Sequence, residues 1–232
     1  GTGEELVTSS RAAVTWLAGL GEGYLADWME IVGVAAGLLR SGQFDEHDAL
    51  VTALADRHRE GGPPTFLHWA LFMLGYSALF RGEYERAEQL LDQSAAVEIP
   101  VGTFSANGPA AARAAFRRGD RARALQLLRD HIVELLATDN TLVASRLVGI
   151  EFVTVMAAIG RFEDAACVLG NLETSGEFWS LILRTVIAET AETIDAHGEG
   201  SADRERGRLL DDRAALAFMR DAIDAAAGGE PG

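Results

Sequence analysis

The residues best suited to metal chemistry stand together in the segment FDEHDAL (44–50), which contains Asp45, Glu46, His47 and Asp48. Carboxylate and imidazole groups are ordinary metal ligands. Consecutive residues of a helix point in different directions, however, so these four side chains cannot converge on one ion. Acidic residues in a first helical turn also complement the helix dipole. We therefore interpret the segment as the start of a helix and expect no metal site.

Other catalytic motifs are missing from the sequence. The chain contains no lysine, so it cannot hold a phosphate-binding loop of the G-x-x-x-x-G-K-[ST] type, and the glycines of GEG (21–23) are too few to indicate such a loop. It also has no G-x-S-x-G motif. The single cysteine, Cys167, excludes an internal disulfide and stands in the apolar segment DAACVLGNL. We interpret it as a small core residue.

His68 is the one histidine whose surroundings could form a pocket, because it stands beside Trp69 in an apolar segment. Most such histidines are hydrogen-bonded core residues. Acid and base partners at matched spacing, which catalysis would need, are missing. We expect no enzymatic activity and no cofactor, and a small all-α enzyme with a pocket near His68 is kept as an alternative.

The charge balance excludes further classes of function. The formal net charge is −15, with 35 acidic and 20 basic residues. Nucleic-acid binding needs a basic surface, so we expect no direct contact with nucleic acid or with anionic membrane. We find no apolar run long enough to span a membrane and no secretory signal, and one unpaired cysteine suits a reducing compartment. The sequence therefore favours a cytoplasmic location.

A short sequence pattern, called the phrase below, occurs four times along the chain. Each copy begins at a glycine, and these glycines are spaced 40, 37 and 41 residues apart: Gly42, Gly82, Gly119 and Gly160. An aromatic residue follows two positions later in three copies: Phe44, Tyr84 and Phe162. Alanine stands five positions after the glycine in three copies: Ala87, Ala124 and Ala165. An aliphatic pair ends all four: Leu50–Val51, Leu90–Leu91, Leu127–Leu128 and Val168–Leu169. The first copy has His47 at the alanine position, and the third copy has Arg121 at the aromatic position.

This phrase predicts helix hairpins. Glycine permits the left-handed backbone that ends one helix, and alanine lets the next helix approach closely. The apolar segments 65–80 and 145–159 fit inner helices, and the breaks at 59–64, 98–109 and 137–141 fit corners. Hairpins of this kind bury their apolar faces by stacking. We predict an all-α, right-handed solenoid of antiparallel hairpins over residues 1–175.

The C-terminal part reads differently. Residues 176–200 predict one more long helix, and residues 201–227 predict a short charged segment and a terminal amphipathic helix, with Ser201 and Asp211 as N-caps. We predict that residues 176–227 form a helical cap continuous with the solenoid, and that residues 228–232 are a disordered tail.

The second copy resembles the tetratricopeptide repeat. Leu74 and Gly75 match the Leu-Gly pair in the first helix of that family, and the turn and second helix match at Gly82, Tyr84, Ala87 and Leu91. The repeat period is longer than the 34 residues of the family, which indicates an elongated variant. In that family the first helix of each hairpin lines a concave binding surface.

Two motifs stand in the C-terminal half. The first, "GR-x-E-x-AA-x-x-LG", is formed by Gly160, Arg161, Glu163, Ala165, Ala166, Leu169 and Gly170, and the second, "G-x-x-L-x-x-x-x-A", by Gly207, Leu210 and Ala215. With these motifs the C-terminal half resembles the end of large bacterial signalling ATPases, including LuxR-type transcriptional regulators. This resemblance implies a binding or sensor arm of a larger bacterial protein, whose partners are a protein, a peptide or other domains of the parent chain. A free-standing scaffold with the same fold is the first alternative, and the oligomeric state stays open.

The family register predicts a binding groove. Carried onto this chain, it places along the concave surface Trp69, Phe72, Tyr76 and Phe80 from the second copy, with Arg40 from the first and Arg113, Phe116 and Arg117 from the third. Aromatic and arginine side chains are typical anchors for a peptide or an anionic ligand. An aromatic stripe at this spacing is also typical of core between hairpins, and this reading is kept beside the first.

Overall fold

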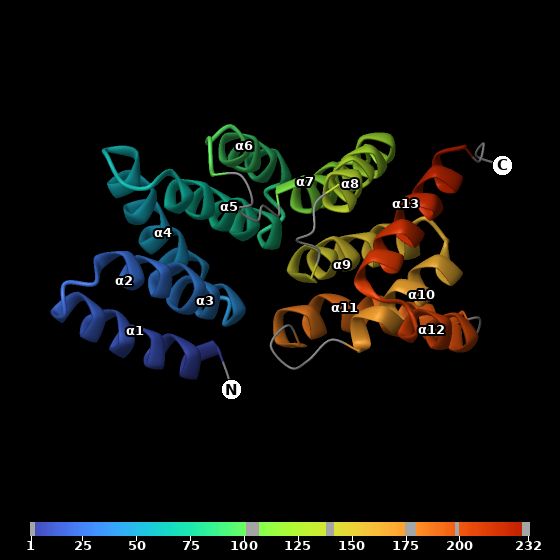
Figure 1. Ribbon diagram of the computed structural model, residues 1–232, viewed down its shortest axis with the longest axis horizontal. Helices are drawn as coiled ribbons and strands as arrows, with labels where there is room; N and C mark the ends of the chain where they lie inside the picture. The colour runs from blue at the N-terminus through green and yellow to red at the C-terminus, as the bar shows by residue number, and fades with distance from the viewer. Residues whose placement is uncertain (1–2, 101–106, 138–141, 175–179, 198–199, 229–232) are drawn as a thin grey trace. The chain divides into compact units, whose positions relative to one another are not determined.

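The computed structural model describes residues 3–100, 107–137, 142–174, 180–197 and 200–228 (Figure 1). These residues lie in helices or in the turns that join them, and no strand occurs among them, which confirms the predicted all-α class. The chain forms two compact units, residues 1–103 and 104–232. The expected boundary at residue 175, between repeats and cap, is a different division and stays a prediction.

The first unit packs around α5, which is apolar on nearly all sides and is buried against α4 and α6. Pro64 occupies the first turn of α5, where its missing N–H costs no hydrogen bond. The predicted helix at 65–80 is thereby confirmed. The helices of this unit are α1 (Gly3–Gly19), α2 (Gly23–Met29), η1 (Glu30–Ala35), α3 (Ala36–Arg40), α4 (Phe44–Arg59), α5 (Pro64–Phe80) and α6 (Tyr84–Ala95).

A π-helical turn, η1, joins α2 to α3 without a break in the helical path. Here the chain lies very close to α1. A side-chain carbon on Gly33 would stand 2.3 Å from Ser10 Oγ, and one on Gly37 would stand 2.7 Å from Val7 Cγ2. These two glycines, one helical turn apart, allow α1 to cross over η1 and α3, and Val7, Val34 and Leu38 form a small core there.

The second unit packs around α9 and α13. Phe152 and Met156 of α9 and Leu216 and Met219 of α13 are fully buried. α13 runs back to lie on α8 and α9, and α10 packs most extensively on α12 (Figure 1). The helices are α7 (Asn107–Arg117), α8 (Arg121–Leu136), α9 (Leu142–Ala158), α10 (Phe162–Glu173), α11 (Ser180–Ala196), α12 (Gly200–Arg208) and α13 (Asp212–Gly228).

The repeated glycines all form the same turn. Each has a positive φ, between 72° and 88°, at Gly42, Gly82, Gly119 and Gly160. At Gly82 the glycine N–H donates to the Leu79 carbonyl and the next N–H donates to the Ala78 carbonyl, and the other three turns repeat both bonds. This is the glycine-terminated helix end in which two otherwise unpaired carbonyls are satisfied.

A fifth copy of this turn occurs at Gly21, which the sequence analysis missed. Gly21 has φ 80°, its N–H donates to Ala18, and the N–H of Glu22 donates to Leu17. The GEG segment therefore forms a helix-terminating turn. It joins α1 to α2 with the geometry of the other turns.

The position five residues after each turn glycine is buried in all five copies. Ala87, Ala124 and Ala165 are fully buried, as predicted for a close helix approach, and Ala26 is nearly so. His47 takes this place in the first copy and is also fully buried. The second residue of each aliphatic pair is buried to within 2% of its surface, at Val51, Leu91, Leu128 and Leu169.

The predicted helix ends are partly correct. Asp211 caps α13, because its Oδ1 accepts a 2.7 Å hydrogen bond from the Ala214 N–H. Ser201 does not cap α12, since that helix already begins at Gly200. The charged segment after residue 200 is itself helical. Of the expected tail, Gly228 ends α13, and residues 229–232 lie outside the described part of the chain.

Candidate functional site

The predicted aromatic residues of α5 form one row. Their spacing places Trp69, Phe72, Tyr76 and Phe80 on one face of the helix. Neighbouring ring centroids lie 5.3 Å, 4.8 Å and 6.2 Å apart along the row, within the range of favourable aromatic pairs. Phe72 is buried, Trp69 and Tyr76 are half-buried and Phe80 is 38% exposed. The row therefore contains one buried ring, Phe72, and three rings that are partly accessible.

Rings from α2 continue this row beyond the predicted set. The ring centroid of Trp28 lies 6.2 Å from that of Trp69 and 5.4 Å from that of Phe66. The ring centroid of Tyr24 lies 5.0 Å from that of Phe66. Phe66 is buried, whereas Tyr24 is 55% exposed. The contacts of α2 with α5 depend on tertiary structure, so the aromatic spacing within 65–80 could not reveal them.

The predicted arginines divide between the two units. Arg40 is half-buried at the end of α3 and forms no ion pair among the described residues. Arg113 and Arg117 belong to α7 of the second unit. Arg113 lies 3.5 Å from the buried Glu151 of α9, so its charge is already matched within that unit. Arg117 is exposed at the last turn of α7, where a cation suits the helix dipole.

Acidic and histidine side chains gather beside the aromatic row, at the π-helical turn. His58 Nε2 stands 3.1 Å from Asp27 Oδ2, and Arg57 Nη1 stands 2.5 Å from Oδ1 of the same carboxylate. Burial raises the pKa of Glu30, and Arg57 nearby opposes this rise. The sequence places His58 at a charged helix end. In the structure it is buried and stacks on Phe66, with ring centroids 4.7 Å apart.

His68 ties α5 to the end of α6. Its Nδ1 lies 3.0 Å from the Ser94 carbonyl, and the Ser94 hydroxyl donates to the His68 carbonyl at 2.7 Å. Burial lowers the pKa of His68, and the hydrogen bond to the Ser94 carbonyl opposes this shift. These contacts give His68 a structural role in this hairpin.

The other sites considered in the sequence also have definite environments. Asp45 pairs with Arg81, and His47 Nδ1 lies 2.9 Å from Asp48 Oδ1. Within the described ranges, no group of three or more His, Cys, Asp or Glu side chains is placed to hold a metal ion. Burial raises the pKa of the Cys167 thiol. None of the helices in the described ranges has the length and apolar character that crossing a membrane requires.

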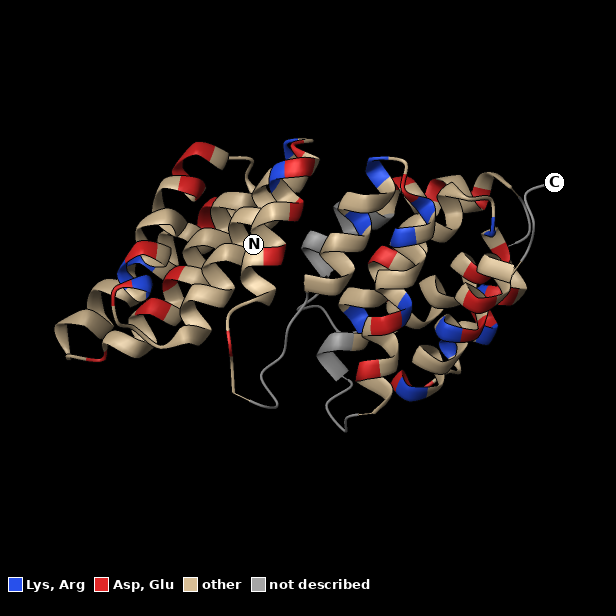
Figure 2. Ribbon diagram, turned by 90° about the horizontal axis from the view of Figure 1, so that it is seen from above, with Lys and Arg blue, Asp and Glu red and all other residues tan. Residues whose placement is uncertain are grey.

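Arginine is unevenly distributed between the units. The second unit carries fourteen of the twenty arginines, whereas the first carries six against fifteen acidic residues (Figure 2). The aromatic row therefore lies in the more acidic unit. Comparisons with protein-family models, curated proteins and solved structures find no match to this chain.

Proposed function

We propose that this chain is a non-catalytic binding arm of a larger cytoplasmic signalling ATPase or transcriptional regulator, built as a right-handed, tetratricopeptide-like solenoid with a C-terminal cap. The observation that carries the proposal is the turn that recurs, with the same two hydrogen bonds, at five glycines. One repeated local structure with a small or buried residue at a fixed place is what stacked hairpins require. The resemblance in sequence supplies the signalling context.

The aromatic row supports a role in binding a protein or peptide partner. Aromatic side chains that are partly accessible and pack on a buried ring are effective anchors. When a partner binds, they bury a large area with little loss of side-chain freedom. Trp69 and Tyr76 both contact the ring of Phe72, so a partner that binds them would meet rings already held in place. Binding of this kind regulates a parent protein only if the partner favours one of its conformations.

Peptide selection tests this function. Peptides are selected from a displayed library against the wild-type chain, and their affinities are measured for Phe80→Ala and Trp69→Phe. We expect at least fivefold weaker binding for both variants. Trp16→Ala is the matched control, because Trp16 is 65% exposed and makes none of the ring contacts of the row. Equal affinity of all four proteins would place binding elsewhere.

A further inference from the structure

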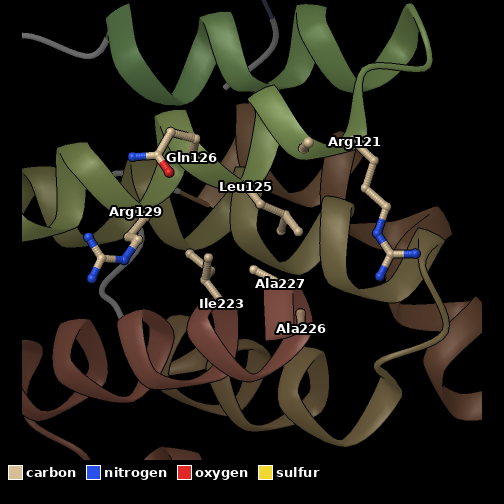
Figure 3. Close-up of a pocket in the computed structure, with 8 residues that line it drawn as sticks. Arg121, Leu125, Gln126, Arg129, Ile223, Ala226 and Ala227 are labelled. Atoms are coloured by element: carbon tan, nitrogen blue, oxygen red, sulfur yellow. The ribbon is translucent and has the colours of Figure 1, made fainter. Parts of the chain in front are cut away.

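A groove lies between α8 and α13 in the second unit, and none of its lining residues belongs to the set predicted from the sequence to bind a partner (Figure 3). Its cavity volume is about 490 Å³. Leu125 of α8 and Ile223 of α13 form a buried floor, and the small side chains of Ala122, Ala226 and Ala227 leave the space above it. Alanine at these positions of two packed helices creates a hollow that a larger apolar side chain can fill.

Two arginines stand at opposite ends of this groove. Figure 3 shows Arg121 at one end and Arg129 at the other, with the apolar residues between them. They are eight positions apart in α8, a distance of roughly 12 Å along the helix axis. A small anion would therefore meet only one of them, whereas an elongated ligand can meet both.

The two guanidinium groups differ in their contacts within the chain. Arg121 is exposed and forms no ion pair among the described residues. Arg129 uses Nε to bind Asp224 Oδ1 at 2.5 Å, which fixes the side chain and leaves both terminal nitrogens outside this contact. Residues 117–130, on one side of the groove, hold five arginines and two aspartates, and α13 on the other side holds two arginines and three aspartates, in a chain of net charge −15. An anionic partner is attracted here and repelled by most of the remaining surface.

The shape of the groove favours a helical partner. α8 and α13 run antiparallel, because Arg129 pairs with Asp224 while Arg213 near the start of α13 donates to the Leu136 carbonyl at the end of α8. Amphipathic helices commonly bind by laying their apolar face into a groove between helices. Glutamates seven positions apart lie on one face of a helix, and leucines between them share that face.

We propose that the groove between α8 and α13 binds an acidic amphipathic helix, with leucines over Leu125 and Ile223 and carboxylates on Arg121 and Arg129. The proposal is independent of the proposed function of the aromatic row, which lies in the other unit. It assigns to this chain a second binding surface, in the second unit.

Fluorescence anisotropy with a labelled, alanine-rich peptide of the pattern E-x-x-L-L-x-x-E tests the proposal. We expect saturable binding to the wild-type chain and at least tenfold weaker binding to Arg121→Gln. This substitution leaves no partner unpaired, so the variant should fold. Arg59→Gln is the charge control in the first unit and should bind as the wild type does. A peptide with glutamine for both glutamates should lose a similar factor.

A second variant tests the apolar part of the site. Ala227→Leu, at an exposed position of the lining, should obstruct the hollow and reduce binding at least fivefold without changing charge. Undiminished binding to either Arg121→Gln or Ala227→Leu would overturn the proposal. Equal affinity for the glutamine peptide, or no saturable binding by the wild-type chain, would overturn it as well.

Discussion

The backbone of Gly207 in α12 lies against the carbonyl oxygen of Cys167 in α10, so closely that a side-chain carbon on Gly207 would stand 1.7 Å from that oxygen. A carbon on Gly170 would likewise stand 2.1 Å from the Arg204 carbonyl oxygen. The two helices therefore cross backbone to backbone, and each contributes one glycine to the crossing. Both glycines belong to the phrases that resemble bacterial signalling regulators, and the crossing gives a physical reason for them.

Replacing Gly207 by alanine should strongly destabilise the second unit. The new methyl group would overlap backbone atoms, which cannot move aside as a flexible side chain can, so we expect a loss of about 2–4 kcal/mol in the free energy of unfolding. Gly19→Ala is the control, because no atom lies within 4 Å of a carbon added there. Urea unfolding of both variants checks this, and an unchanged midpoint for Gly207→Ala would mean that the crossing is wrong.

Cys167 should react slowly in the native chain. Its thiol is buried, and burial raises its pKa, so the reactive thiolate is scarce at pH 8. We expect labelling by a disulfide reagent at least about 100-fold slower than that of a free thiol, with the rate rising steeply in denaturant. In Gly207→Ala, the loosened contact between α10 and α12 should accelerate the reaction. Rapid labelling of the native wild-type chain would contradict this description.

The hairpin of α5 and α6 should not accept a large side chain at Ala87. Ala87 is fully buried, and a carbon added to the neighbouring Gly75 would already stand 2.9 Å from Leu91. We expect Ala87→Trp to cost about 3 kcal/mol or more, because no space exists for the ring. Ala53→Trp, at an exposed site of α4, should cost less than about 1 kcal/mol. Thermal melting compares them, and near-normal melting of Ala87→Trp would show that the repeat alignment is wrong.

His131 should make stability depend on pH. Burial in α8 lowers its pKa to about 4, and the nearest carboxylate oxygen, Glu134 Oε2, lies 3.8 Å away. The imidazole of His131 is protonated near pH 6.5 in the unfolded chain, whereas in the folded chain it is protonated only near pH 4. The contribution of His131 to the free energy of unfolding is therefore fully present above pH 7. It falls by about 3 kcal/mol as the pH drops from 6.5 to 4.

Chemical unfolding of the wild type and of His131→Gln, measured between pH 7.5 and pH 4.5, isolates this contribution. His47 and His68 are also buried with lowered pKa values, so part of the slope should persist in the variant. A slope that His131→Gln leaves unchanged would show that this histidine is protonated in the folded chain.

The local parts of the fold could be predicted because their causes are local. A glycine followed at fixed distances by alanine and leucine specifies a turn and a close helix pair within about ten residues of sequence. The turn at Gly21 escaped detection because Gly23 stands where other copies have an aromatic residue, and Glu30 stands where they have the second aliphatic residue. Only its backbone geometry shows the equivalence.

The remaining features depend on contacts between distant segments. The groove beside Arg121 exists because α13 returns to α8, and nothing in the pattern of either helix encodes that return. The burial of His47, His58 and His131 likewise depends on how the helices pack. The aromatic row, by contrast, lies within one helix, so the alignment of its four rings on one face could be read from the sequence alone.

The size of the native polypeptide tests the central claim most directly. An antibody raised against this segment is used to blot an extract of the cells that produce the protein. We predict a band several times larger than the 24.8 kDa of this chain, as expected for an arm of a signalling protein. A single band near the mass of the chain itself would contradict this claim, and a free-standing adaptor would then explain the repeats and the aromatic row better.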